Sequence, residues 1–256
     1  MELLKLEHIF LSYHTPGGET PALQDVSFSL EQGEFAAIVG PSGCGKSTIL
    51  NLIDRLLPPE SGNIFIEGKP LADSHLNIGY MLQKDHLFEW RTIYSNVLLG
   101  LEIQHKLTPE NRARVEDMLE AYGLAPFRNA RPSELSGGMR QRAALIRTLA
   151  LDPALLLLDE PFSALDYQTR LHVADDIGQI IRRERKTALL VTHDISEAIS
   201  MADRVIILSP RPARVRRIVP VSLSIPERTP MRSREAPEFK TYFNLIWKEL
   251  NSHEGD

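Results

Sequence analysis

The stretch that decides the fold is GPSGCGKS at residues 40–47, which matches the phosphate-loop pattern G-x-x-x-x-G-K-[ST] in full. The apolar run at 34–39 before it predicts a strand buried on both faces, and residues 46–57 have helical spacing. In such a strand-to-helix turn, backbone N–H groups converge on phosphate oxygens, Lys46 adds a positive charge toward the β and γ phosphates, and the Ser47 hydroxyl can ligate Mg²⁺. The stretch therefore predicts a nucleoside triphosphate site.

The loop contains the only cysteine of the chain, Cys44. It excludes an intrachain disulfide, and no general base stands beside it in sequence, so we interpret its side chain as filler rather than as a nucleophile. We expect the loop and the residue that follows it to bind the nucleotide: Gly40, Pro41, Ser42, Gly43, Cys44, Gly45, Lys46, Ser47 and Thr48.

The composition is that of a folded globular chain. Its 256 residues are 43% hydrophobic and 25% charged, which is close to the average and argues against disorder. The balance of 29 Lys+Arg against 34 Asp+Glu gives a net charge of −5, so we expect no nucleic-acid partner. The apolar runs fall far short of the ~18 residues of a spanning helix, and Glu2 and Glu7 stand where a signal peptide needs positive charge. A cytoplasmic protein is expected.

Strand and helix patterns alternate along most of the chain. Alternating runs before residue 31, separated by PGG at 16–18, predict a hairpin, and residues 92–123 are helical with a break at Pro109. Strand patterns at 78–82, 154–158, 187–192 and 204–208 are interspersed with helical patterns at 139–151, 166–183 and 195–201. We predict an α/β fold with a mainly parallel core sheet, an N-terminal antiparallel β subdomain and a helical subdomain.

Two carboxylates, Asp159 and Glu160, end the apolar run at 155–158. A buried strand delivers them to the edge of the sheet, where crevice-bound ligands lie. We expect Asp159 to orient the Mg²⁺ shell and Glu160 to hold and deprotonate the attacking water, because cleavage of the γ-phosphate needs mainly positioning and charge stabilisation. The alternative is a pair of residues that caps a helix starting at Pro161.

A second phosphate-binding segment is predicted at LSGGMRQR, residues 135–142. The Ser136 side chain and the N–H groups of Gly137 and Gly138 open a helix, although an ordinary helix cap would have the same residues. The segment closely resembles the signature of the ABC-type ATPases, with Met139 where many members have Gln. The resemblance implies that two ATPase domains pair head to tail, so that the signature of one closes over ATP held by the phosphate loop of the other.

The resemblance extends to four further elements in family order. Tyr13 stands where the family has an aromatic that stacks on adenine, and Gln83 resembles the glutamine that senses Mg²⁺ and the attacking water. The SALD stretch at 163–166 resembles the loop that crosses the dimer interface, and His193 resembles the switch histidine that contacts the γ-phosphate. Alone, each has a simpler explanation: a strand-end tyrosine, a surface glutamine, a helix cap at Asp166 and a structural histidine.

The segments between the motifs indicate which kind of ATPase this is. LFEWRT at 87–92 is apolar and aromatic with flanking charge, which suits a groove for a partner helix, although Phe88 and Trp90 could instead pack in the core. Together with the signature and SPRPAR at 209–214, it resembles the nitrate/sulfonate/taurine group of bacterial importers, which includes importers of thiamine precursors. The resemblance implies a homodimeric ATPase, peripheral at the cytoplasmic face of the membrane, with separate permease chains and an external binding protein.

Two other functions are weighed against transport. ABC machines that act on DNA or ribosomes usually have two modules in one chain, coiled-coil arms, zinc fingers or basic extensions, and the sequence has no such pattern. A regulatory protein that binds nucleotide without hydrolysing it would be expected to lack Glu160 or His193, and both are present.

The domain division follows from these assignments. We expect the ABC ATPase domain at 1–225, including the helical subdomain at about 92–150, and a C-terminal extension at 226–256. The last ~45 residues are rich in Pro and Arg and are predicted to be mostly loop. Their final helix has one apolar face that we expect to dock on the core: Phe239, Tyr242, Phe243, Ile246, Trp247 and Leu250.

Overall fold

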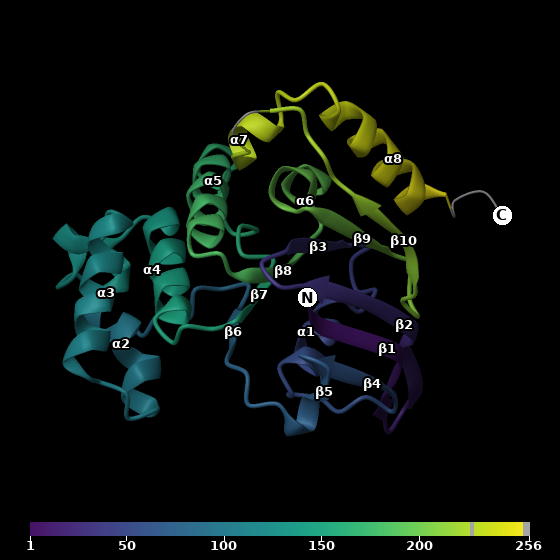
Figure 1. Ribbon diagram of the computed structural model, residues 1–256, viewed down its shortest axis with the longest axis horizontal. Coiled ribbons are helices and arrows are strands. Elements are labelled where there is room, and N and C mark those ends of the chain that lie inside the picture. The colour runs from purple at the N-terminus through teal and green to yellow at the C-terminus, as the bar shows by residue number, and fades with distance from the viewer. Residues whose placement is uncertain (226–227, 253–256) are drawn as a thin grey trace.

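Two β-sheets form the body of the molecule (Figure 1). The computed structural model describes residues 1–225 and 228–252; residues 226–227, where the predicted C-terminal extension begins, and 253–256 lie outside the described residues. The larger sheet has the order β10-β9-β3-β8-β7-β6, and the smaller has the order β2-β1-β4-β5. The larger sheet contains β3 (Phe35–Val39), β6 (Ile78–Met81), β7 (Leu155–Asp159), β8 (Thr187–Thr192), β9 (Arg204–Leu208) and β10 (Val215–Pro220).

The larger sheet is parallel except at β10, and both of its faces are buried. Ala37 and Val39 of β3 pack on the side of α4 (Gly137–Leu149), α5 (Tyr167–Arg183) and α6 (Ile195–Met201). Ala36 and Ile38 pack on the side of α1 (Lys46–Ile53) and the smaller sheet. Burial on both faces explains why these strands are continuous apolar runs, and the predicted α/β class is correct.

The helix after the phosphate loop, α1, is shorter than the predicted 46–57 because it ends at Ile53. Asp54 caps it, and Arg55 has a left-handed backbone with φ 62°. A residue in that conformation cannot continue a right-handed helix.

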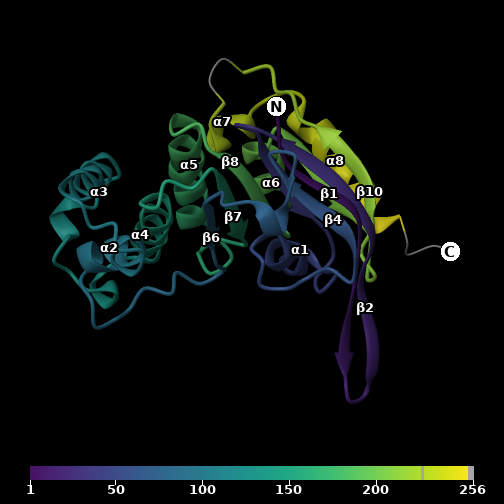
Figure 2. The same cartoon turned by 60° about the horizontal axis from the view of Figure 1, so that its bottom comes forward.

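The smaller sheet is antiparallel and is built on a long hairpin. β1 (Glu2–Thr15) pairs with β2 (Gly18–Glu31), and Tyr13 lies opposite Thr20. The tip of this hairpin projects from the body of the molecule (Figure 2). The remaining strands are β4 (Ser61–Ile66) and β5 (Lys69–Pro70).

Three helices lie together at one side of the core sheet (Figure 1): α2 (Ile93–Ile103), α3 (Pro109–Ala121) and α4. Pro109 is the first residue of α3, where a missing N–H costs no hydrogen bond, and Thr108 caps the helix. The sequence break at Pro109 therefore marks the start of a new helix. No helix within the described residues has the length and apolar character that crossing a bilayer requires.

The C-terminal segment is more ordered than the loop-rich prediction. Val215–Pro220 forms β10, an edge strand that pairs antiparallel with β9. The arginines and prolines of this segment obscured the strand pattern in the sequence. In the structure Val219 is buried and Arg217 faces solvent, and Pro220 ends the strand at an edge where no N–H is needed.

The last helix, α8 (Phe239–Asn251), docks on the core as expected, but with a narrower face. Ile246 is fully buried, whereas Trp247 is 57% exposed and its ring stacks on that of Phe243. The prediction that Trp247 docks on the core is therefore wrong. Residue 247 follows the buried Ile246 directly, and neighbouring residues of a helix point about 100° apart.

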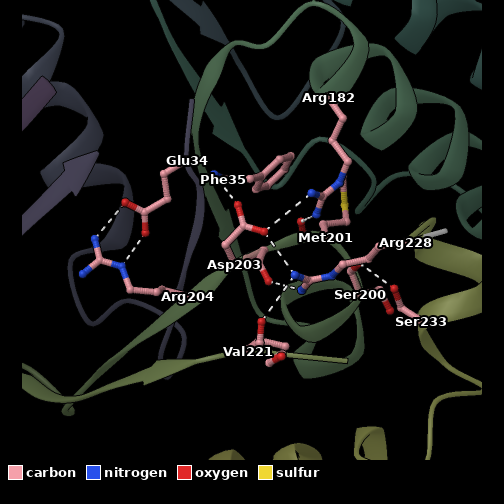
Figure 3. Close-up of polar contacts among 12 residues, drawn as sticks. Glu34, Phe35, Arg182, Ser200, Met201, Asp203, Arg204, Val221, Arg228 and Ser233 are labelled. Carbon is pink, nitrogen blue, oxygen red and sulfur yellow. Dashed lines mark hydrogen bonds and ion pairs between the residues drawn. The ribbon is translucent and has the colours of Figure 1, made fainter. Parts of the chain in front are cut away.

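A polar clasp centred on Asp203, just before β9, joins four segments of the chain (Figure 3). The Asp203 carboxylate accepts the Phe35 N–H at 3.0 Å and an N–H of Arg228 at 3.1 Å, and it pairs with Arg182 at 3.5 Å. The guanidinium of Arg228 also donates to the backbone carbonyls of Ile199, Ala202 and Val221. The clasp thereby fixes the C-terminal segment to the start of β3 and the end of α6.

We predict that Arg228→Ala lowers the free energy of unfolding by about 2–3 kcal/mol, or Tm by roughly 5–10 °C, because it leaves several partly buried acceptors without a donor. Urea denaturation measures the change. The control is Arg217→Ala, which removes a half-exposed ion pair with Glu249 and should cost under about 1 kcal/mol. Equal small effects of the two variants would contradict the clasp.

Candidate functional site

The phosphate loop forms the tight turn between β3 and α1 that the sequence predicts. Gly43 and Gly45 have left-handed φ values of 73° and 122°. A Cβ on Gly45 would lie 2.9 Å from the Leu23 side chain and 3.2 Å from the Ala22 carbonyl. Glycine is therefore required at residue 45 both by the backbone angle and by the close approach of β2.

An open cavity of about 240 Å³ lies against this loop. Of the nine residues at 40–48 that are predicted to bind the nucleotide, Gly40, Pro41 and Cys44 are not among its lining. Cys44 is buried beneath the loop, and burial raises the pKa of its thiol, in keeping with the interpretation as filler. The cavity is lined by Tyr13, Ala22, Ser42, Gly43, Gly45, Lys46, Ser47, Thr48, Glu160 and Arg211.

Lys46 is almost fully buried and is held by the loop itself. Its Nζ donates to the Gly40 carbonyl at 2.9 Å and to the Pro41 carbonyl at 3.0 Å. The ammonium group therefore lies within the turn, where a bound anion would meet a fixed positive charge.

Asp159 lies at the end of β7 beside the first turn of α1. Its carboxylate accepts a hydrogen bond from the Ser47 hydroxyl at 3.1 Å and a long one from the Tyr80 hydroxyl at 3.4 Å. Burial raises the pKa of Asp159; the Ser47 hydrogen bond opposes that change, and the charge of Glu160 adds to it. The helix-cap alternative is wrong, because the next helix begins at Tyr167 and its cap is Asp166.

Glu160 and His193 meet at the edge of the sheet. β7 and β8 are parallel neighbours, so the residues that follow them lie side by side, and Glu160 Oε2 is 3.0 Å from His193 Nδ1. Glu160 has a left-handed backbone, with φ 43°, and its N–H donates to the Val191 carbonyl at 2.8 Å. Such a conformation costs roughly 1–3 kcal/mol, and it turns the Glu160 side chain into the lining of the cavity.

Gln83 is linked to Glu160 through the Ser163 hydroxyl. Its Nε2 donates to the Ser163 hydroxyl at 3.3 Å, and that hydroxyl donates to the Glu160 carbonyl at 3.0 Å. Among the described residues no hydrogen bond joins Gln83 to Ser47 or Asp159. The role of Gln83 at the metal stays a prediction.

The signature residues Ser136, Gly137 and Gly138 begin α4, and they are not part of the cavity lining. The Ser136 hydroxyl accepts the Met139 N–H at 3.3 Å. A Cβ on Gly137 would lie 2.9 Å from the Leu165 side chain, so this turn packs tightly against the SALD stretch. The two phosphate-binding segments predicted for one chain, the phosphate loop and the signature, therefore lie at different sites.

Comparison with known proteins identifies the family. Residues 23–163 match the family described as ABC transporter. The ABC transporter ATP-binding protein YtlC of Bacillus subtilis is 46% identical over 99% of this chain and 98% of its own. The chain belongs to the ABC transporter family. It is therefore an ATPase cassette.

Two other similar proteins show the same relationship in sequence and in structure. The aliphatic sulfonates import ATP-binding protein SsuB of Bacillus licheniformis is 39% identical over 92% of this cassette and 89% of its own chain. The ATP-binding cassette MJ0796, in a dimeric post-hydrolysis state bound to ADP and Pi, superimposes with a TM-score of 0.73, 31% identity, and coverage of 86% of this cassette and 99% of that chain.

No role was predicted from the sequence for four residues that tie the segment after Gln83 to α4 in this cassette: Asp85, His86, Arg140 and Arg147. Arg140 Nε donates to the Asp85 carboxylate at 3.1 Å, and Arg147 donates at 2.7 Å to each of the Asp85 and His86 carbonyls. The spacing of seven between the two arginines was a usable signal, because residues two turns apart share a helix face.

A buried carboxylate, Glu197, lies in the first turn of α6, four residues after His193. It is 4% exposed and accepts the Thr192 hydroxyl at 2.6 Å. Burial raises the pKa of Glu197, with the Thr192 hydrogen bond in opposition. The folded state therefore favours the protonated form, and ionisation above the ordinary pKa costs stability.

We predict that Glu197→Gln raises Tm by a few degrees at neutral pH, because the amide oxygen can still accept the Thr192 bond without a buried charge. The gain should shrink as the pH falls through the folded-state pKa, where the wild-type carboxyl is also neutral. The measurement is thermal denaturation from pH 4 to 8 without nucleotide.

The matched control is Asp152→Asn. The hydrogen bond from Lys186 lowers the pKa of Asp152, so folding favours the ionised form of this carboxyl. Asp152→Asn should therefore not raise Tm at neutral pH. A pH-independent effect of Glu197→Gln would contradict the prediction.

Proposed function

We propose that this cassette is the ATP-hydrolysing subunit of an importer for a small solute of the sulfonate or taurine type, acting on a separate membrane permease. The observation that carries the hydrolytic role is the contact between Glu160 and His193 at the cavity of the phosphate loop. The importer role is supported by SsuB and by the taurine import ATP-binding protein TauB of Jannaschia sp., which is 38% identical over 83% of this chain and 80% of its own.

The proposed reaction gives roles to residues at or beside the cavity. The loop amides and Lys46 bind the β and γ phosphates, and Tyr13 stacks on adenine. Glu160 positions the attacking water and accepts its proton, while His193 holds the Glu160 carboxylate and contacts the γ-phosphate. Because the charged groups are held in place before the reaction, most of the rate acceleration comes from positioning and charge stabilisation rather than from covalent catalysis.

Ser47 and Asp159 fit Mg²⁺, which prefers oxygen ligands and is usually held by few protein groups together with phosphate oxygens. The raised pKa of Asp159 is in keeping with this, because a buried carboxylate without a cation is unfavourable. Bound there, Mg²⁺ supplies charge neutralisation at the β and γ phosphates. Gln83 is proposed to join this shell when the nucleotide is present.

A second copy of the chain completes the proposed site. Ser136, Gly137 and Gly138 lie outside the cavity of their own chain; Gly138 is buried, whereas Ser136 is exposed and Gly137 partly exposed, so Ser136 and Gly137 are the residues that we propose to contact the γ-phosphate held by a partner. The dimeric state of MJ0796 supports this arrangement.

An exposed aromatic patch formed by Phe88 and Trp90 is the proposed contact with the permease. These side chains are 36% and 74% exposed, and their ring centroids are 4.7 Å apart in a stacked arrangement. The core-packing alternative is wrong for both aromatic residues. The buried Asn96 holds the loop in place by accepting the Phe88 N–H at 2.7 Å, which gives a partner helix a rigid surface to bind.

We predict that Glu160→Gln reduces ATP hydrolysis by at least about two orders of magnitude, because the positioned base is lost while the phosphate loop is intact. Nucleotide affinity should be retained, and an ATP-bound dimer should accumulate in size-exclusion chromatography. The control is Lys46→Ala, which should lose nucleotide binding itself. Unchanged turnover of Glu160→Gln would remove Glu160 from the mechanism.

We predict that Trp90→Glu spares basal ATP hydrolysis and abolishes co-sedimentation with membranes that contain the permease, because it places a charge in an apolar interface. The control, Ile103→Glu, changes an equally exposed apolar residue, 68% exposed, outside the patch and should sediment normally. Loss of binding by both variants, or by neither, would contradict this assignment of the patch.

A further inference from the structure

The turn between β9 and β10 lies against the nucleotide cavity although it is far from the phosphate loop in sequence. The Ala213 N–H donates to the Ala22 carbonyl at 2.8 Å, and the Gln24 N–H donates to the Ala213 carbonyl at 2.9 Å. These bonds add the turn to the edge of β2, next to Gly45 of the phosphate loop. The turn is thus a fixed part of the cavity wall.

One side chain of this turn, Arg211, reaches the cavity. Its Nε donates to the Pro21 carbonyl at 3.0 Å, and it lines the cavity together with Tyr13. Within residues 1–225 and 228–252, the two terminal nitrogens of Arg211 have no hydrogen-bond partner. The guanidinium is therefore oriented by one anchored N–H while its other donors and its flat faces stay available.

The position of Arg211 indicates which part of a nucleotide it would meet. Lys46, Ser47 and Glu160 are the lining residues proposed to act on the phosphates, whereas Tyr13, whose hydroxyl lies 3.0 Å from that of Thr48, is the lining aromatic proposed to stack on adenine. Pro21 pairs with Ser12 in the hairpin and thus adjoins the Tyr13–Thr20 pair, so the anchor of Arg211 lies beside Tyr13.

We propose that Arg211 is a nucleotide-binding residue whose guanidinium contacts the adenosine half of ATP. A guanidinium stacks on aromatic faces and donates to ribose oxygens, and anchoring reduces the entropy lost on binding. The contact deepens the proposed function, on whose nucleotide site it rests, by giving the adenosine a second holding group besides Tyr13. It assigns a role to the SPRPAR segment that the catalytic motifs leave unexplained.

The test compares ATP with inorganic tripolyphosphate, which has the phosphates without the nucleoside, by isothermal titration calorimetry on the full chain. Arg211→Ala should weaken ATP binding about three- to tenfold and leave tripolyphosphate binding unchanged. In steady-state hydrolysis, KM for ATP should rise by the same factor with kcat unchanged. Retained tripolyphosphate binding also shows that the variant is folded.

Two further variants make the outcome decisive. Arg214→Ala removes an exposed arginine of the same turn that bonds Gln24 at 3.2 Å and does not line the cavity, so both ligands should bind as in the wild type. Arg211→Lys keeps the charge without the flat group and should restore at most part of the ATP affinity.

Four results would overturn the proposal. These are no loss with Arg211→Ala, an equal loss for both ligands, an equal ATP loss in Arg214→Ala, and full recovery by Arg211→Lys. If instead the assignment of the nucleotide site were wrong, the result would differ: Lys46→Ala would bind both ligands as well as the wild type does.

Discussion

The site depends on the parallel register of three neighbouring strands. Val39 of β3 pairs with Thr192 of β8, and Asp159 of β7 pairs with Val191, so the phosphate loop, the carboxylates and His193 all leave the sheet at one edge. Because both faces of these strands are buried, a slip of one residue would exchange the two cores and separate Glu160 from His193. The apolar packing that stabilises the sheet therefore also sets the distances on which the chemistry relies.

The parts of the site that could be predicted are those that local sequence determines. A glycine-rich turn between a buried strand and a helix, and acidic residues after an apolar run, require only neighbouring residues to be recognised. Contacts between distant segments could not be read in this way. The clasp of Asp203 with Arg228 and the pairing of β10 with β9 join residues whose spacing carries no pattern. The exposed Trp247 shows that a helical face read from sequence is wider than the face that packs.

Under the proposed function, the cassette keeps its two phosphate-binding ends apart within one chain. The cavity lies at the core sheet, whereas Ser136 caps α4, one of the three helices at the side of that sheet. A single chain can thus hold ATP without assembling every group that hydrolysis needs. The strained backbone of Glu160 and the packing of Gly137 against Leu165 place both halves on rigid supports, so that assembly requires the approach of surfaces rather than local refolding.

The two guanidinium groups on α4 have a mechanical consequence. Arg140 and Arg147 grip Asp85 and His86, and Phe88 follows within two residues. Because these bonds fix the segment before Phe88 to α4, a displacement of the aromatic patch would be transmitted to the helix that begins after Ser136. Under the proposed function, movement of a permease helix at the patch would therefore change the orientation of the signature segment of one subunit toward the ATP bound by the other.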